Sequence, residues 1–200
     1  MKKVIIGLVG LLVVGGVASL LWPSINSTND LTFINYQDVF SLEHDEYFVY
    51  FYNEDCRFCI ELEPYIMKAH RAGVPIYVVD MVDPANANAW FDWDAHHALH
   101  TTVVGEVVDG EEVYAEDFDP AQFPEEEGWA IVPQGEQLVA RLNRADFNRN
   151  PQSPEEIEVA GTPSMIHIVN GQGAGFDMGV AESRRLLATY AGLEQPLFED

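Results

Sequence analysis

The chain has 200 residues, of which 48% are hydrophobic and 22% charged, a composition suited to one well-packed domain with an elaboration. It carries 33 Asp and Glu against 10 Lys and Arg, giving a formal net charge of −23. Nucleic acid and anionic lipid head groups would repel such a chain, so the charge argues against both as partners.

The N-terminal Met-Lys-Lys is followed by a run without a charged residue from Val4 to Trp22. A helix of about this length crosses the ~30 Å hydrocarbon core of a bilayer. Residues 1–22 are therefore expected to be a single-pass anchor in the cell membrane, with the lysines in the cytoplasm and the following domain outside it. The alternative is a signal peptide cleaved near Ala18, which would also export the domain.

Residues 23–30 are polar and are expected to form a linker, and residues 31–195 to form the domain. A short strand is expected at 31–34, and apolar residues at helical spacing predict a helix over 36–42. The run YFVYFY at 47–52 is apolar on both faces, which is typical of a central strand covered on both sides.

A helix over 56–71 and a buried strand over 74–79 follow this central strand. The apolar residues at helical spacing are Ile60, Leu62, Tyr65, Ile66 and Ala69. Since a strand, a helix and a strand occur in this order, a parallel crossover is predicted. Near the C-terminus, Asn170-Gly171 between two strand-like runs predicts a hairpin, and 181–190 predicts an amphipathic helix.

Residues 83–152 exceed the ~30 residues of one crossover, so they are expected to be an α+β insertion before the final hairpin. A helix is predicted from Asp83, as its cap, to about His100. Two hairpins are predicted over 103–114 and 129–142.

The two cysteines of the chain, Cys56 and Cys59, enclose a loop too short to stabilise the fold much as a structural disulfide. Cys56 begins a predicted helix, where unpaired N–H groups and the helix dipole favour the thiolate. Cys59 lies one turn further on. This pattern predicts a redox pair that cycles between dithiol and disulfide, with half of a metal site as the alternative.

The cysteine motif resembles that of the thioredoxin family: a strand, Cys-x-x-Cys at a helix start, Pro64 five residues after the second cysteine, and a later Gly161-Thr162-Pro163 before a hairpin and a helix. The resemblance covers about 31–80 and 155–192. It implies an α/β thioredoxin-like three-layer sandwich with a mixed central sheet, in which Pro163 is a cis-proline facing the active site.

By this resemblance the chain is a thiol-disulfide oxidoreductase in which Cys56 attacks a disulfide and Cys59 resolves the mixed disulfide. The expected substrate-binding residues are Arg57, Phe58, Thr162 and Pro163. The expected partners are exported proteins with thiols or disulfides and a redox partner that regenerates the pair. Neither an organic cofactor nor a metal is implied.

Two positions depart from the family pattern. Arg57-Phe58 is neither the Gly-Pro of thioredoxins nor the x-His of disulfide oxidases and isomerases. Tyr50 stands where thioredoxins carry a buried acid that helps to deprotonate the second cysteine. Arg57 favours a thiolate whereas Glu54 and Asp55 oppose it, so oxidase, reductase and isomerase activities all remain open.

Other hypotheses give the cysteines no catalytic role. The chain would then be a thioredoxin-like adapter in an export or envelope assembly, with its function in the insertion, or a metal-binding protein. His96, His97 and His100 offer ligands for zinc with the cysteines, or for a separate metal with Asp92 or Asp94. The distance in sequence from Cys59 to the histidines is far outside zinc-finger spacing.

Two further features of the insertion have competing interpretations. The acidic loops lack the twelve-residue pattern of a calcium loop. Trp90, Phe91 and Trp93 are expected to be ordinary core residues, with the alternative that the insertion forms a wall or lid beside the cysteines.

Overall fold

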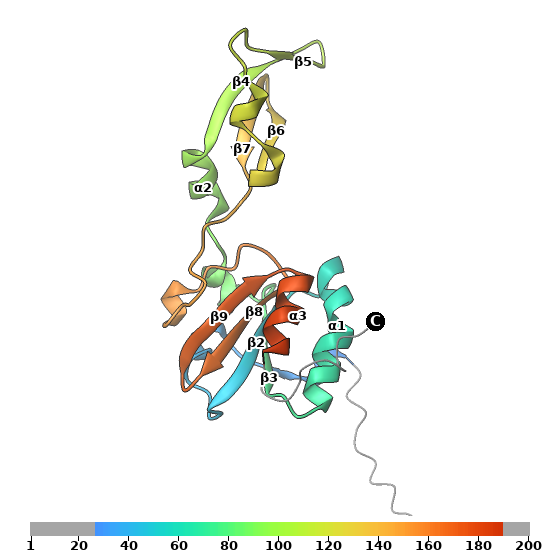
Figure 1. Cartoon of the computed structure of the whole chain (residues 1–200), viewed down its shortest axis with the longest axis vertical. Helices are drawn as coiled ribbons and strands as arrows, with labels where there is room; N and C mark the ends of the chain where they lie inside the picture. Colours follow the sequence, from blue (N-terminus) through green and yellow to red (C-terminus); the bar gives the residue numbers. More distant parts are fainter. Residues whose placement is uncertain (1–26, 190–200) are drawn as a thin grey trace, which may run out of the picture.

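Two β-sheets organise residues 27–189, the part of the chain that this computed structural model describes. The five-stranded sheet, in the order β1-β3-β2-β8-β9, lies in the core (Figure 1). The four-stranded sheet, in the order β5-β4-β7-β6, belongs to an arm that projects from the core (Figure 1). The anchor predicted at 1–22 lies outside the described residues; among those that are described, no helix has the length and apolar character needed to span a membrane.

The core sheet combines parallel and antiparallel strands. Its strands are β1 (Thr32–Phe33), β2 (Glu46–Tyr52), β3 (Ile76–Asp80), β8 (Ser164–Val169) and β9 (Gln172–Met178). Strands β1 and β2 run parallel to β3, whereas β8 runs antiparallel to β2 and β9 antiparallel to β8. The predicted α/β class with a mixed central sheet is therefore confirmed.

Strand β2 is buried on both of its faces. Tyr47, Val49 and Phe51 pack on one side of the sheet, and Phe48 and Tyr50 pack on the other. All five side chains are fully inaccessible to solvent. The unbroken apolar run thus forms the central strand that its pattern predicted, because neither face meets water.

Two helices cover the face of Phe48 and Tyr50: α1 (Arg57–Arg71) and α3 (Val180–Ala188) (Figure 1). Helix α1 turns Cys59, Leu62, Ile66 and Met67 toward the sheet. Ile60, which the periodicity placed on the inner side, is instead 61% exposed. The buried face of α1 therefore begins at Cys59 and does not include Ile60.

The opposite face of the sheet is covered by 3-10 turns and loops. The segments are η2 (Tyr36–Asp38), η3 (Pro84–Ala89) and η6 (Pro154–Glu156), whereas η1 (Thr28–Asp30) lies against α1, where the Thr28 N–H donates to Glu63 at 2.6 Å. The helix predicted over 36–42 is wrong, because this segment closes its turns with bonds to the third residue back, such as Val39 N–H to the Tyr36 carbonyl at 3.3 Å. Buried Tyr36 and Val39 still pack on the sheet from this turn.

The long helix predicted from Asp83 to His100, where the chain enters the arm, is wrong. The chain forms η3, then an extended stretch in which Trp90 bridges Val159, and then the short helix α2 (Trp93–Leu99). The helix is interrupted because backbone groups pair with Val159 instead: the Val159 N–H donates to the Ala89 carbonyl at 2.7 Å, and the Phe91 N–H donates to the Val159 carbonyl at 3.1 Å.

Both predicted hairpins of the insertion are confirmed. Strands β4 (Thr101–Val108) and β5 (Glu111–Tyr114) turn at Asp109-Gly110, whose φ angles are both positive as a tight hairpin turn requires. Strands β6 (Trp129–Gln134) and β7 (Gln137–Leu142) form the second hairpin, and β4 pairs with β7 to join the two. The turns η4 (Pro120–Gln122) and η5 (Glu125–Glu127) connect the hairpins.

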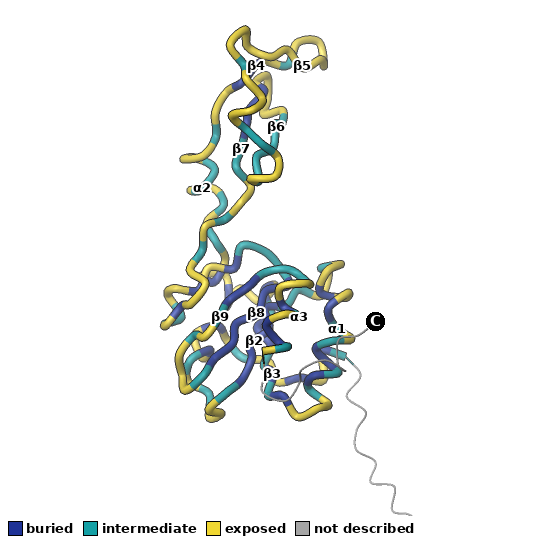
Figure 2. Tube along the Cα trace, in the orientation of Figure 1, coloured by how far each residue is buried: buried dark blue, intermediate teal, exposed yellow. Residues whose placement is uncertain are grey.

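The arm has a small apolar core of its own. Val104, Leu138 and Ala140 are buried there, and the partly buried residues packed against them are Phe118, Phe123, Trp129 and Ile131. Figure 2 shows this core as short dark stretches within an arm that is otherwise of intermediate burial or exposed. The arm sheet therefore depends on few apolar contacts.

Replacing Leu138 by Ala should destabilise the arm by about 2–4 kcal/mol, because Leu138 is fully buried and its loss leaves a cavity. Leu99→Ala is the matched control, since Leu99 is 80% exposed in α2 and its loss should change stability by less than about 0.5 kcal/mol. Amide hydrogen exchange of β4 and β7 measures the effect. Equal protection in the two variants would contradict the assignment of an arm core.

Candidate redox site

Cys56 is held at the junction between β2 and α1. Strand β2 ends at Tyr52, and the chain turns with the Cys56 N–H donating to the Asn53 carbonyl at 3.1 Å. Cys56 is the N-cap residue of α1, and its Sγ accepts the N–H of Cys59 at 3.3 Å. A sulfur thus occupies the place where a helix start offers unpaired N–H groups and positive dipole charge.

The loop before β8 lies against this sulfur. The antiparallel register pairs Phe51 with Ser164, so the end of β2 lies beside the start of β8. The Thr162–Pro163 peptide bond is cis, and the Cys56 Sγ lies 3.1 Å from the Thr162 carbonyl oxygen, 106 residues away in the sequence. The structure therefore brings Cys56, Cys59 and the Thr162–Pro163 pair together at one end of the core.

Hydrogen bonds lower the pKa of Cys56 below its ordinary value. Burial alone raises the pKa, since it disfavours the charged thiolate. Hydrogen bonds from the Thr162 side chain, from the Cys59 thiol and from the backbone N–H groups of Cys59 and Phe58 together outweigh burial. The half-buried Cys56 is consequently the thiol suited to act as nucleophile near neutral pH.

Burial has the opposite outcome at Cys59, whose side chain is inaccessible to solvent. Desolvation and the hydrogen bond that its thiol gives to Cys56 raise the pKa of Cys59 to about 11. The two cysteines are therefore unequal: Cys56 ionises readily, and Cys59 holds its proton.

Tyr50 is the polar side chain that reaches Cys59 from the sheet. Its hydroxyl donates to the Cys59 carbonyl oxygen at 3.4 Å, and a hydrogen bond from the same hydroxyl lowers the pKa of Cys59 against the effect of burial. Burial raises the pKa of Tyr50 far above its ordinary value, so Tyr50 remains a neutral donor.

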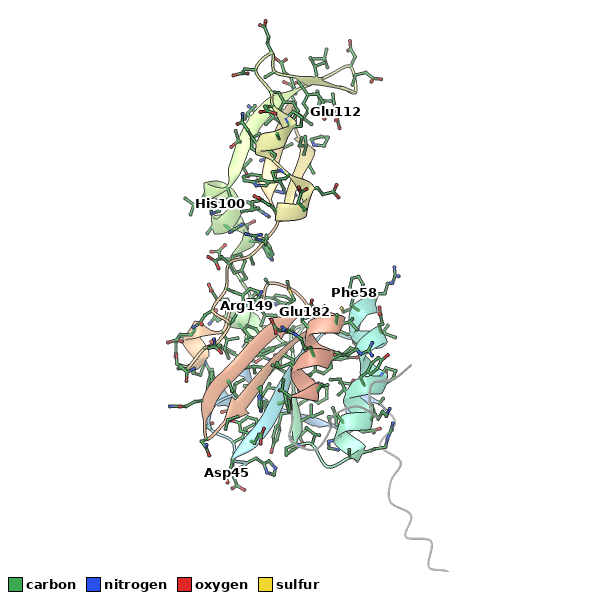
Figure 3. The ribbon with its side chains drawn as sticks, viewed as in Figure 1. Asp45, Phe58, His100, Glu112, Arg149 and Glu182 are labelled. Atoms are coloured by element: carbon green, nitrogen blue, oxygen red, sulfur yellow. The ribbon has the colours of Figure 1, made fainter. Side chains whose placement is uncertain are left out.

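Arg57 and Phe58, the other predicted site residues, are exposed beside Cys56 at the start of α1. Phe58 is 53% exposed and lies at the end of the core from which the arm rises (Figure 3). The Arg57 guanidinium lies 5.8 Å from the centre of the Phe58 ring. Ile60 is a further exposed apolar side chain on the same helix, so the first turns of α1 carry two exposed apolar residues close in sequence to the cysteines.

The histidines of α2 make aromatic contacts. His97 stacks on Trp93 with ring centres 5.3 Å apart, and the His96 Nε2 lies 3.2 Å from the Leu142 carbonyl oxygen. Within residues 27–189, no group of three or more His, Cys, Asp or Glu side chains is arranged to hold a metal ion. The histidine metal sites considered from the sequence thus find no support in the geometry.

Comparison with known proteins adds no family: no family model, no curated protein and no solved structure matches the chain.

Alkylation of the reduced protein should modify Cys56 first. Its lowered pKa should place the midpoint of rate against pH below the ~8.5 of a free cysteine, whereas Cys59, with a pKa of about 11, should remain protonated and unmodified at neutral pH. Iodoacetamide labelling between pH 5 and 10, with peptide mapping by mass spectrometry, measures the midpoint of Cys56 and shows whether Cys59 reacts in the same range. Coinciding midpoints, or earlier labelling of Cys59, would contradict the assignment.

Proposed function

We propose that the chain is a thioredoxin-like thiol-disulfide oxidoreductase that acts on exported proteins through Cys56 and Cys59. The single observation that carries the proposal is the inequality of the two thiols: a half-buried Cys56 with a lowered pKa at a helix start, and a buried Cys59 with a raised pKa one turn later. Such a pair suits a nucleophile followed by a resolving thiol.

The proposed exchange proceeds in two balanced steps. The Cys56 thiolate attacks one sulfur of a substrate disulfide; a mixed disulfide forms, the substrate S–S bond breaks, and the released thiolate takes up a proton. Cys59 then loses its proton and attacks the Cys56 sulfur, which forms the Cys56–Cys59 disulfide and releases the second substrate thiol. The substrate is reduced by two electrons and the pair is oxidised by two.

The fold around the cysteines supports this proposal. The mixed central sheet and the cis peptide before Pro163 agree with what the resemblance to the thioredoxin family implies, whereas one face of the sheet carries 3-10 turns in place of the helices that a three-layer sandwich would have there. The exposed Arg57, Phe58 and Ile60 and the loop at Thr162 supply a surface on which an extended substrate segment would lie.

The proposal includes a location and a second partner. The apolar run from Val4 to Trp22 would anchor the domain outside the cytoplasm, where disulfides persist. The chain has two cysteines, so regeneration of the pair requires an external dithiol or disulfide partner. The reduction potential of the pair decides whether net transfer is oxidation or reduction.

The Cys59→Ser variant should accumulate a mixed disulfide through Cys56, because the resolving thiol is gone. Incubation with a synthetic peptide that contains one disulfide, followed by non-reducing mass spectrometry, measures this species. Cys56→Ser is the control and should form no adduct.

Failure of both the wild-type protein and Cys59→Ser to exchange with the peptide would refute catalysis. A Cys56→Ser, Cys59→Ser double variant with full biological activity would favour the adapter hypothesis instead.

Replacing Tyr50 by Phe should slow the resolving step about two- to tenfold, because the hydroxyl lowers the pKa of the buried Cys59. Tyr47→Phe is the matched control: Tyr47 lies on the same strand, is equally buried, and donates to the Val39 carbonyl at 2.7 Å on the opposite face. Rapid-quench analysis of mixed-disulfide decay measures the rate. Equal rates in the two variants would show that Tyr50 has no such effect.

A further inference from the structure

The loop at residues 159–163 carries the contact to Cys56, and its carbonyl groups have identified donors. Donors from the core bond the last three carbonyl groups: the Ser164 hydroxyl bonds Gly161 at 2.6 Å, the Cys56 thiol bonds Thr162 at 3.1 Å, and the Gly179 N–H bonds Pro163 at 2.8 Å. The position of the Thr162 carbonyl therefore depends on how the rest of the loop is held.

The first two carbonyl groups of this loop are bonded by the base of the arm. The Phe91 N–H donates to Val159 at 3.1 Å, and the Trp93 indole N–H donates to Ala160 at 3.0 Å. Both donors belong to the segment through which the chain enters the arm. The arm is thus joined to the loop two residues before Thr162.

The Trp93 indole is fixed from the side of the arm. Its ring packs edge-to-face on Phe91 with ring centres 4.9 Å apart and stacks on His97 of α2 at 5.3 Å. Trp93 is the first residue of α2, and Asp92 caps this helix by accepting the Ala95 N–H at 2.8 Å. A shift of α2 would be transmitted to Ala160 through one hydrogen bond.

We propose that Trp93 is a positioning residue of the redox site: its indole N–H holds Ala160 so that Thr162 stays against Cys56, and it couples the arm to the reactivity of that thiol. The inference rests on the proposed function, because it assigns to the insertion a role in the exchange reaction. The Thr162 carbonyl accepts the Cys56 thiol proton at 3.1 Å, which favours the neutral thiol, whereas hydrogen bonding from the Thr162 side chain favours the thiolate. A displacement of Thr162 changes both contacts, which gives this coupling a measurable consequence.

Trp93→Phe in the full chain removes the N–H and keeps an aromatic ring. We expect the midpoint of Cys56 alkylation against pH to shift by about half a unit, which corresponds to a roughly threefold change in the thiolate fraction below the midpoint. Trp90→Phe is the matched control, since the Trp90 indole stands at the same base but donates to the Met81 carbonyl at 3.2 Å, outside the loop. Its midpoint should equal that of the wild type.

Thermal unfolding separates positioning from stability, because a merely structural role would lower the unfolding temperature without moving the alkylation midpoint. If Trp93→Phe fails to fold, benzothienylalanine at position 93 replaces only the N–H by sulfur and gives the same test. Equal midpoints in the wild type and the position-93 variant would overturn the inference while leaving exchange with the peptide disulfide intact. Loss of exchange by the wild type would instead overturn the proposed function.

Discussion

The contact between the Cys56 sulfur and the Thr162 carbonyl is the constraint on which the candidate site depends. It joins the start of α1 to the loop before β8 across 106 residues of sequence. The Cys59 N–H binds the same sulfur from the helix side, so two separate elements define its surroundings. Because thiolate character responds to each of these hydrogen bonds, small displacements of either element would change the chemistry of Cys56.

The central strand β2 makes this contact possible. Its side chains are buried on both faces, which fixes β2 between α1 and α3 on one side and 3-10 turns on the other. The pairing of Phe51 with Ser164 then places the end of β2 beside the start of β8. Burial of the same strand brings Tyr50 to Cys59, so one strand positions the surroundings of both thiols.

The arm stands in contrast to this core. Its sheet buries Val104, Leu138 and Ala140, and most of its surface remains exposed (Figure 2). The buried carboxylate of Asp177 in β9 accepts hydrogen bonds from Arg149, which lies on the chain returning from the arm, and from Arg185 of α3. The arm is therefore tied to the core on both of its connections, at Trp93 on the way out and at Arg149 on the way back.

Local patterns in the sequence were sufficient to predict the α/β class, the central strand, α1 and the three hairpins. Hydrophobic periodicity, turn residues and helix caps depend on residues close in sequence, so they can be recognised without knowing which segments pack against each element. The position of Cys56 at a helix start likewise predicted that its thiolate would be favoured, which agrees with the lowered pKa of Cys56. The helix expected over 36–42 was wrong because apolar residues three apart also suit a 3-10 turn. Only the tertiary structure decided that Trp90 would leave a helix to bridge Val159, that Tyr50 would reach Cys59, and that Trp93 would hold the loop at Ala160, since these contacts join residues brought together by packing.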